Sequence, residues 1–488
     1  MAGDEELGTG RTGGRDATTG VIPGRVALSV GCPDLEPPKG WKWTMLSSVA
    51  QLESGHTPSR KHPEYWDGGI PWIGIKDATE NHGRTLPDTY QHVSALGLEN
   101  SSARLLPANT VCLSRTASVG FVVVMGRPMA TSQDFVNWVC GPNIEAHYLK
   151  YVLLAENEAL WRFASGTTHQ TIYYPEAKAF HVCLPPLAEQ KAIAAVLGAL
   201  DDKIELNRRM NATLEAMART LFQSWFVDFD PVRAKLDGRK PIGLDETTAA
   251  LFPDSFQDSA VGHIPNGWRV GVLDELTKFV IGGDWGATEP TDDETVSCYC
   301  IRGADIPSLQ SGGVGKMPTR FLKPSSVEKR QLADGDVAIE ISGGSPTQCT
   351  GRPVLASDAL LQSLGQPLVA SNFCRILKLK SPALSKFVYL WLRQLYDVGE
   401  LFQFETGTTG IKNFAFVIFS ERYPLVVPDL RVAEAFDRAL SPFLARIQAN
   451  SKESRTLATL RDTLLPKLLS GELSPKIVSQ STEGLAAR

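Results

Sequence analysis

The most constraining feature of this 488-residue chain is an internal duplication. Short motifs from the first half recur in the same order in the second half, 226 to 243 residues later. Chance would produce one such echo but not an ordered series, so the sequence predicts two copies of one structural unit. The five pairs are Pro38–Trp41 with Pro265–Trp268, Ile75–Ala78 with Ile301–Ala304, Pro107–Val111 with Ala333–Val337, Gly166–Thr168 with Gly407–Thr409, and His181–Pro185 with Pro424–Pro428.

Each copy has the pattern of a mixed α/β domain with many loops. Short β-branched runs such as Phe121–Val124 and Phe135–Trp138 alternate with Gly, Pro and Asn turns. Helices are expected within Glu145–Phe163 and Leu384–Leu401. The variable offset between motifs indicates that the two copies differ by loop insertions.

After the closing proline of each copy the pattern becomes helical, and the offset stays at 243 residues. Seam positions step by four and three, which is the spacing of a heptad repeat. Gly198 and Ser441-Pro442 predict a bend between a short and a long helix, and Pro466 is expected to end the second helix. The seam comprises Leu200, Ile204, Asn207, Leu214 and Leu221 in the first copy and Phe443, Ile447, Asn450, Leu457 and Leu464 in the second.

A single heptad helix cannot bury its own seam, so the two helices are expected to pack together. Asn207 and Asn450 hold equivalent positions and would fix the register if buried, although two solvent-facing asparagines fit the pattern equally well. We expect an antiparallel pair, which places the two globular domains at opposite ends in a pseudo-twofold arrangement. A parallel pair, with both domains at one end, is the alternative that the linker length allows.

The expected helix length suggests a spacing role. Each long helix would have roughly 23–27 residues, or about 35–40 Å at 1.5 Å per residue. One turn of B-DNA spans about 34–36 Å. Two reading domains held that far apart would meet equivalent groove faces, so the helices would act as a ruler in any bipartite DNA reader.

Composition excludes several classes of function. The net charge of -5 argues against a protein that coats DNA by bulk charge, but it leaves local basic patches possible. No stretch approaches the roughly 20 apolar residues of a membrane span. The acidic start Met1–Glu6 is unlike a secretory signal, so we expect a cytoplasmic protein. The eight cysteines form no CxxC pair and are expected to be reduced and mostly buried.

Motifs for catalysis are missing from the sequence. An adenine methyltransferase would need an Asn/Asp-Pro-Pro-aromatic motif and a glycine-rich cofactor turn. The segment Gly312–Lys316 hints at a phosphate loop, but Gln310 replaces its leading glycine and Met317 its magnesium-binding Ser/Thr, so we expect a basic surface loop. The histidines form no metal-ligand pair at helical spacing. We assign no catalytic residue, metal or cofactor to this chain.

Four segments resemble the specificity subunits of type I restriction-modification systems, and the resemblance runs from about Lys39 to Leu473. It implies two target-recognition domains that each read one half of an asymmetric split DNA sequence, and helices that bind two modification subunits. It further implies that those subunits methylate adenine with S-adenosylmethionine, and that restriction subunits add translocation and cleavage with ATP and Mg²⁺. This chain would itself be non-catalytic. The segments are Leu184–Lys191, Leu221–Asp230, Gly262–Trp268 and Leu464–Gly471.

The resulting fold class is α+β: two duplicated mixed α/β target-recognition domains separated by two long antiparallel coiled-coil helices. The expected boundaries are 1–36 for a disordered N-terminal extension, 37–184 for the first domain, 185–227 for the first helical region, 228–263 for a linker, 264–427 for the second domain, 428–473 for the second helical region and 474–488 for a tail.

DNA reading needs Arg, Lys, Asn, Gln, Ser or Thr at groove edges and phosphates. The two Gly-Thr-Thr loops are favoured because the duplication places them alike, and Gln170 could contact adenine through both amide atoms. Trp41 and Trp268 are expected in the core rather than stacked on bases. For any single loop residue an ordinary solvated turn is the alternative. The candidates are Arg60, Lys61, Arg115, Thr167, Thr168, His169 and Gln170 in the first domain, and Lys316, Arg320, Thr408, Thr409, Lys412 and Asn413 in the second.

Two other classes of function compete with this interpretation. One is a helical adaptor whose duplicated domains bind proteins or glycans, which the acidic net charge favours. The other is a self-sufficient methyltransferase or nuclease, for which the required motifs are missing. The basic Gly/Thr loops in both copies and the family resemblance favour the DNA reader.

Overall fold

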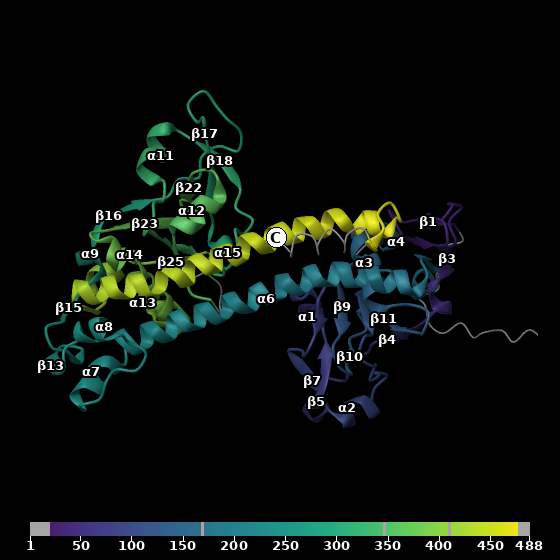
Figure 1. Ribbon diagram of the computed structural model, residues 1–488, viewed down its shortest axis with the longest axis horizontal. Helices are drawn as coiled ribbons and strands as arrows, with labels where there is room; N and C mark the ends of the chain where they lie inside the picture. Colours follow the sequence, from purple (N-terminus) through teal and green to yellow (C-terminus); the bar gives the residue numbers. More distant parts are fainter. Residues whose placement is uncertain (1–19, 167–169, 345–347, 408–410, 477–488) are drawn as a thin grey trace, which may run out of the picture. The chain divides into compact units, whose positions relative to one another are not determined.

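The structure is a computed structural model that describes residues 20–166, 170–344, 348–407 and 411–476 (Figure 1). The chain divides into two compact units. Unit 1 comprises Met1–Asp202 and Leu457–Arg488, and unit 2 comprises Lys203–Thr456. Each unit therefore contains part of both long helices, α6 (Leu187–Phe226) and α15 (Leu430–Leu469).

The centre of unit 1 is a five-stranded sheet in the order β4-β11-β8-β9-β6. The valine-rich strands β8 and β9 are buried throughout, as expected for β-branched runs inside a sheet. Helix α3 packs on these two strands, and α4 follows it after Glu156. The bounds are β4 Ala50–Ser54, β11 Phe135–Cys140, β8 Val111–Ser114, β9 Val122–Met125, β6 Thr85–Leu86, α3 Ala146–Ala155 and α4 Asn157–Phe163.

Two smaller sheets complete unit 1, one in the order β10-β5-β7 and one in the order β1-β2-β12-β3. The short helices α1, α2 and α5 also belong to unit 1, and Ser94 caps α2 by accepting the Gly97 N–H. The bounds are β10 Ala130–Thr131, β5 Trp66–Ile73, β7 Gln91–Val93, β1 Ile22–Pro23, β2 Leu28–Val30, β12 Phe180–Leu184, β3 Lys42–Met45, α1 Ile75–Glu80, α2 Ala95–Glu99 and α5 Tyr174–Lys178.

Unit 2 repeats the topology of unit 1, which confirms the predicted duplication. The sheet β16-β23-β19-β21 matches β4-β11-β8-β9, and β22-β17-β18 matches β10-β5-β7 with the same parallel and antiparallel pairings. The antiparallel pair β15–β26 corresponds to β3–β12. The bounds are β15 Arg269–Gly271, β16 Thr277–Gly282, β17 Val296–Ile301, β18 Thr319–Leu322, β19 Val337–Glu340, β21 Pro353–Leu355, β22 Leu368–Ala370, β23 Cys374–Leu379 and β26 Leu425–Val427.

Unit 2 also contains a small sheet in the order β20-β25-β24 and the six helices α9 to α14. Ser357 caps α12 by accepting the Leu360 N–H, and the predicted helix at 384–401 is α13 followed by a short 3-10 turn. The bounds are β20 Ser342–Gly343, β24 Glu405–Thr406, β25 Lys412–Phe414, α9 Leu273–Leu276, α10 Ile306–Gln310, α11 Pro324–Arg330, α12 Asp358–Leu364, α13 Ser385–Asp397 and α14 Phe416–Arg422.

Two segments that we expected to be irregular are structured. Within the predicted extension, β2 pairs with β12, and the Glu156 carboxylate accepts the N–H groups of Val26 and Ala27. The predicted linker at 228–263 holds two helices and most of a hairpin, because Phe229, Val232 and Phe252 join the core of unit 2. These elements are α7 Asp230–Leu236, α8 Glu246–Ala250, β13 Phe256–Ser259 and β14 Gly262–Pro265.

The long helices run without the predicted bends, so the expectations for Gly198, Pro442 and Pro466 were wrong. Each helix has 40 residues, or about 60 Å at 1.5 Å per residue, which is longer than the spacing argument assumed. A proline inside a helix removes one backbone hydrogen bond. The burial of side chains close to it, such as Leu440, stabilises the helix by more than that hydrogen bond would. Among the described residues, no helix has the length and apolar character needed to cross a bilayer.

Within unit 2 the two long helices pack antiparallel, as predicted. Asn207 lies against Asn450, and Asn211, one turn further along α6, lies against Ile447, one turn earlier in α15. Both predicted seam asparagines are buried rather than solvent-facing. The Asn450 side chain donates to the Asn211 Oδ1 at 2.9 Å, and the Asn207 side chain donates to the Glu453 carboxylate at 2.8 Å. The other seam residues are buried or half-buried in the helix pair.

In unit 1 a cluster of charged side chains links the two long helices to α3. The Asp201 carboxylate on α6 accepts hydrogen bonds from Lys150 at 3.1 Å, Tyr151 at 2.7 Å and Arg461 at 2.8 Å. Because Lys150 belongs to α3 and Arg461 to α15, one carboxylate joins three helices. Only 5% of the Lys150 side chain is exposed, so its charge depends on this partner.

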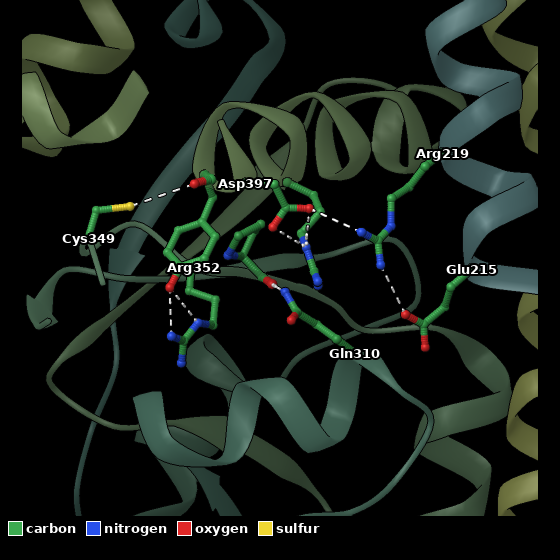
Figure 2. Close-up of polar contacts among 9 residues, drawn as sticks. Glu215, Arg219, Gln310, Cys349, Arg352 and Asp397 are labelled. Atoms are coloured by element: carbon green, nitrogen blue, oxygen red, sulfur yellow. Dashed lines mark hydrogen bonds and ion pairs between the residues drawn. The ribbon is translucent and has the colours of Figure 1, made fainter. Parts of the chain in front are cut away.

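Unit 2 has a small pocket where unit 1 has that cluster. Ala218 and Leu444 hold the seam positions of Arg461 and Asp201, and the short Ala218 side chain leaves space that Tyr389 and Leu440 line. At its rim Arg219 joins Glu215 and Asp397, at 3.4 and 3.3 Å, with Gln310 close by (Figure 2). The same helix packing is therefore completed by charges in one unit and by apolar groups in the other.

Replacing Asp201 with asparagine is expected to lower the free energy of unfolding by about 3 kcal/mol at neutral pH, because Lys150 and Arg461 lose their counter-charge. Although burial raises the pKa of Asp201, the charge of Lys150 and the hydrogen bonds from Arg461 and Tyr151 hold that pKa below its ordinary value. The stabilisation is thus complete above about pH 4 and is lost as the pH falls through the lowered pKa.

Urea denaturation of the full chain between pH 7 and pH 3 measures this effect. The difference between wild type and Asp201→Asn should shrink below about pH 4. Asp202→Asn, which changes the adjacent exposed aspartate, is the matched control and should have little effect. An equal loss of stability at both ends of the pH range would show that the carboxylate charge is unimportant.

Candidate nucleic-acid interface

One edge of the central sheet in unit 1 gathers several of the predicted loops. Because β11 is antiparallel to both β4 and β8, the ends of β4 and β8 meet the start of β11 at this edge. The segment from Ser165 to Thr171 attaches here through the bridges Thr116–Thr171 and Ser165–Thr171. Arg115 and Gln170 therefore lie on neighbouring segments, while Thr167, Thr168 and His169 lie outside the described residues.

Unit 2 builds the same edge from the same parts. The ends of β16 and β19 meet the start of β23, and β25 pairs with both β20 and β24. Lys412 and Asn413 belong to β25, while Thr408 and Thr409 lie outside the described residues. Gly166 and Gly407, which open the two Gly-Thr-Thr loops, both have a left-handed φ, at 138° and 117°, where only glycine is unstrained.

Close backbone contacts that the sequence did not reveal hold these edges together. A Cβ on Gly55 would lie 2.0 Å from the carbonyl oxygen of Ser132, and one on Gly283 would lie 2.0 Å from that of Ser371. Gly55 follows β4, and Gly283 follows β16. Because glycine has no side chain, the loop after each strand can lie directly against the backbone at Ser132 or Ser371. The sequence does not distinguish these two glycines from the others among its 42, because the close backbone contacts are visible only in the structure.

The polar residues of the two Gly-Thr-Thr segments differ in how free they are. The Gln170 side chain is exposed and, among the described residues, donates to the Gly166 carbonyl at 3.0 Å. Lys412, by contrast, forms an ion pair with Glu405 at 2.7 Å, and the Asn413 side chain accepts a hydrogen bond from Ser342. Gln170 is therefore the better placed of these residues to meet a base edge.

Three predicted arginines share a feature that the sequence did not show: each lies over an aromatic ring. The guanidinium carbon of Arg60 lies 4.2 Å from the Trp66 ring centre, that of Arg115 4.8 Å from Tyr174, and that of Arg320 3.9 Å from Trp285. Within the described parts of the chain, none of the three forms an ion pair with a carboxylate. Each ring thus orients the guanidinium group without neutralising its positive charge. That charge stays available to an anionic ligand.

The two edges differ in the residue that ends the strand next to β11 or β23. β8 ends at Ser114, whereas β19 ends at Glu340, which is buried below the Gly343 loop. Burial raises the pKa of Glu340, and the nearby Arg352 partly opposes this rise. The two edges therefore present different electrostatic surfaces, which suits domains that bind different sequences.

The glycine-rich segment Gly312–Lys316 is not the free surface loop that we expected. Gly312 is buried, with a φ of 81°, and a Cβ there would lie 2.6 Å from Ile447 and Ser451 of α15. The Asp305 carboxylate accepts the Lys316 N–H at 2.9 Å and leaves the Lys316 side chain exposed. Asp77 accepts the N–H of Tyr90 in the same way in unit 1.

Other predictions concern residues away from these edges. Trp41 and Trp268 lie in the cores of their units, as expected. Lys61 is exposed beside Arg60. Cys32 is the exposed cysteine, and the others are buried or half-buried thiols without disulfides. Among the described residues, no group of three or more His, Cys, Asp and Glu side chains is arranged to hold a metal ion.

The chain thus consists of duplicated mixed α/β units, each with the same loop edge and with part of both long helices. Comparisons place it more narrowly. Residues 38–216 match the family model described as the type I restriction modification DNA specificity domain. The chain is 25% identical over 441 residues to the type I restriction enzyme MjaIX specificity subunit of Methanocaldococcus jannaschii, covering 89% of this chain and 94% of that protein.

A second relative is the type I restriction enzyme HindI specificity subunit of Haemophilus influenzae, which is 24% identical and covers 71% of this chain and 84% of that protein. The fold is also that of the crystal structure of the type I restriction-modification S subunit from M. genitalium, with a TM-score of 0.50, 16% identity, and coverage of 90% and 98%. Over most of its length, this chain is therefore similar to specificity subunits of type I restriction enzymes.

Replacing Gly312 with alanine is expected to destabilise the chain by about 3 kcal/mol, because a Cβ is strained at this φ and collides with α15. Gly365→Ala is the matched control, since Gly365 has a φ of 72° in open space and should cost only about 1 kcal/mol. Urea midpoints of the two full-length variants measure the difference. Equal losses would mean that the loop does not dock on α15.

Proposed function

We propose that this chain is the DNA sequence-specificity subunit of a type I restriction-modification complex and reads a bipartite, asymmetric DNA sequence with its two duplicated domains. The observation that carries the proposal is the recurrence of one loop edge in both units, with stacked arginines that have no carboxylate partner among the described residues. Such groups supply the base and phosphate contacts that sequence reading requires. The similarity to type I restriction enzyme specificity subunits supports the same function.

The complex would contain two modification subunits, held on the long helices, and restriction subunits. Methylation would use S-adenosylmethionine, and translocation and cleavage would use ATP and Mg²⁺, all bound by those partner subunits. This chain would act in the cytoplasm without catalysing a reaction itself. The names of the relatives, which are specificity subunits of type I restriction enzymes, support these assignments.

Co-expression with its modification subunits is expected to methylate adenines at one split motif in the host genome. Mapping the modified adenines by single-molecule sequencing gives the two half-sites and the spacer. Expression of the modification subunits without this chain is the control and should leave the motif unmodified. Modified adenines with no common split sequence would contradict the proposal.

Gln170→Ala is expected to weaken DNA binding by about 1–3 kcal/mol and to relax sequence preference in one half-site only. Asn413→Ala should do the same in the other half-site, with a smaller effect because Ser342 already engages its side chain. Methylation of duplexes that each carry one altered base pair separates the two. A uniform loss across all duplexes would reject base reading by these residues.

A further inference from the structure

The stacks of Arg60 and Arg320 join the same two segments in each unit, but the arginine and the tryptophan have exchanged places. In unit 1 the arginine lies on the loop after β4, and its ring partner Trp66 begins β5 of the three-stranded sheet. In unit 2 the tryptophan, Trp285, lies on the loop after β16, and Arg320 lies on β18 of the three-stranded sheet. Each unit thus joins the same loop to the same sheet by an arginine–tryptophan stack, with the partners exchanged.

The surroundings of each stack restrict the arginine further. In unit 1, Trp72 packs edge-on to Trp66 at 5.2 Å and lies 5.7 Å from Arg60, whose Nη2 donates to the Gln91 side chain at 2.9 Å. The indole N–H of Trp72 donates to the His56 carbonyl at 3.0 Å. Trp72 on β5 is therefore tied to the loop, and it supports the Trp66 ring that carries the guanidinium.

In unit 2 the loop is fixed by its backbone. Ala287 and Phe321 exchange hydrogen bonds at 2.9 and 3.0 Å, which ties the loop to β18 beside Arg320. Gly286, next to Trp285, has a φ of 62°, and a Cβ there would lie 2.4 Å from the Phe321 carbonyl oxygen. Arg320 itself donates to Thr288 through one Nη.

Both arginines keep the donors needed for a planar two-point contact. A guanidinium has five N–H groups, and each terminal nitrogen carries two of them. One donation to Gln91 or to Thr288 leaves at least one N–H on each terminal nitrogen. That pair matches the O6 and N7 acceptors of guanine in the major groove.

From these contacts, and resting on the proposed function, we propose that Arg60 and Arg320 each read a guanine in a different half-site, and that Trp66 and Trp285 are the positioning residues that hold them. The rings replace the carboxylates that usually orient an arginine. They fix the plane of the guanidinium without cancelling its charge. Arg60 extends from a loop, whereas Arg320 extends from strand β18. The two units therefore need not read the same sequence.

The test uses the complex with its modification subunits and measures initial methylation rates on duplexes that carry single base-pair changes. Arg60→Lys keeps the charge but loses the planar fork, so discrimination at one G·C pair of one half-site should fall about 10- to 100-fold. The slope of DNA binding against salt should stay unchanged. Arg320→Lys should do the same at a G·C pair of the other half-site.

The positioning role is tested through the rings. Trp66→Leu should reduce discrimination at the same base pair about 2- to 5-fold, and Trp66→Phe should restore most of it. The double variant Trp66→Leu/Arg60→Lys should discriminate no worse than Arg60→Lys alone, since the ring acts only through the arginine. Trp285 and Arg320 give the parallel set for the other half-site.

Arg233→Lys is the matched control, because Arg233 also lies over a ring, 5.4 Å from Phe256, but outside the loop edge. It should leave every half-site preference unchanged. Arg60→Lys and Arg320→Lys acting on the same half-site, or lowering rates uniformly on all duplexes, would overturn the inference. If wild type methylates a split motif and these variants keep its full discrimination, the inference fails alone; if wild type recognises no split motif, the proposed function fails.

Discussion

The structure depends on an exchange of helix segments between the two copies of the duplicated sequence. Unit 1 completes its core with Leu465, Leu468 and Leu469 from the end of α15, and unit 2 completes its core with Phe222 and Phe226 from the end of α6. Each core therefore includes a helix segment that belongs to the other copy of the repeat. Loss of the helix contacts would open both cores, which couples the stability of the two recognition units to the helix pair.

Polar groups in the helix pair add specificity to that coupling. Asn207, Asn211 and Asn450 are buried, and their hydrogen bonds form only in the observed antiparallel register. A shift of one helical turn would separate Asn450 from Asn211, and each buried amide left without a partner would cost about 1–3 kcal/mol. The asparagines thus favour one alignment of the helices over others that would bury a similar apolar area.

The sequence allowed the duplication, the mixed α/β class and the antiparallel seam to be predicted, because each depends on periodicity. The bends expected at Gly198 and Pro442 did not form, since buried packing close to these residues outweighs a weak local preference. The stacks of Arg60 on Trp66 and of Arg320 on Trp285 could not be predicted. Their partners lie six residues apart on one side and thirty-five on the other, and exchange roles between the copies, so no shared motif marks them.

The acidic net charge, which favoured an adaptor at first, is compatible with selective DNA reading. Some cations of the helices and units are paired, as Arg208 is with Glu205 and Lys412 with Glu405, and a paired charge attracts phosphates of any sequence less strongly. Non-specific affinity rises with every such free charge, whereas base contacts add affinity only at the cognate site. A genome offers a vast excess of non-cognate sites, so the ratio of the two affinities decides where the protein binds. A guanidinium held by an aromatic ring, as Arg60 is by Trp66, raises that ratio when it contacts a base edge rather than a phosphate.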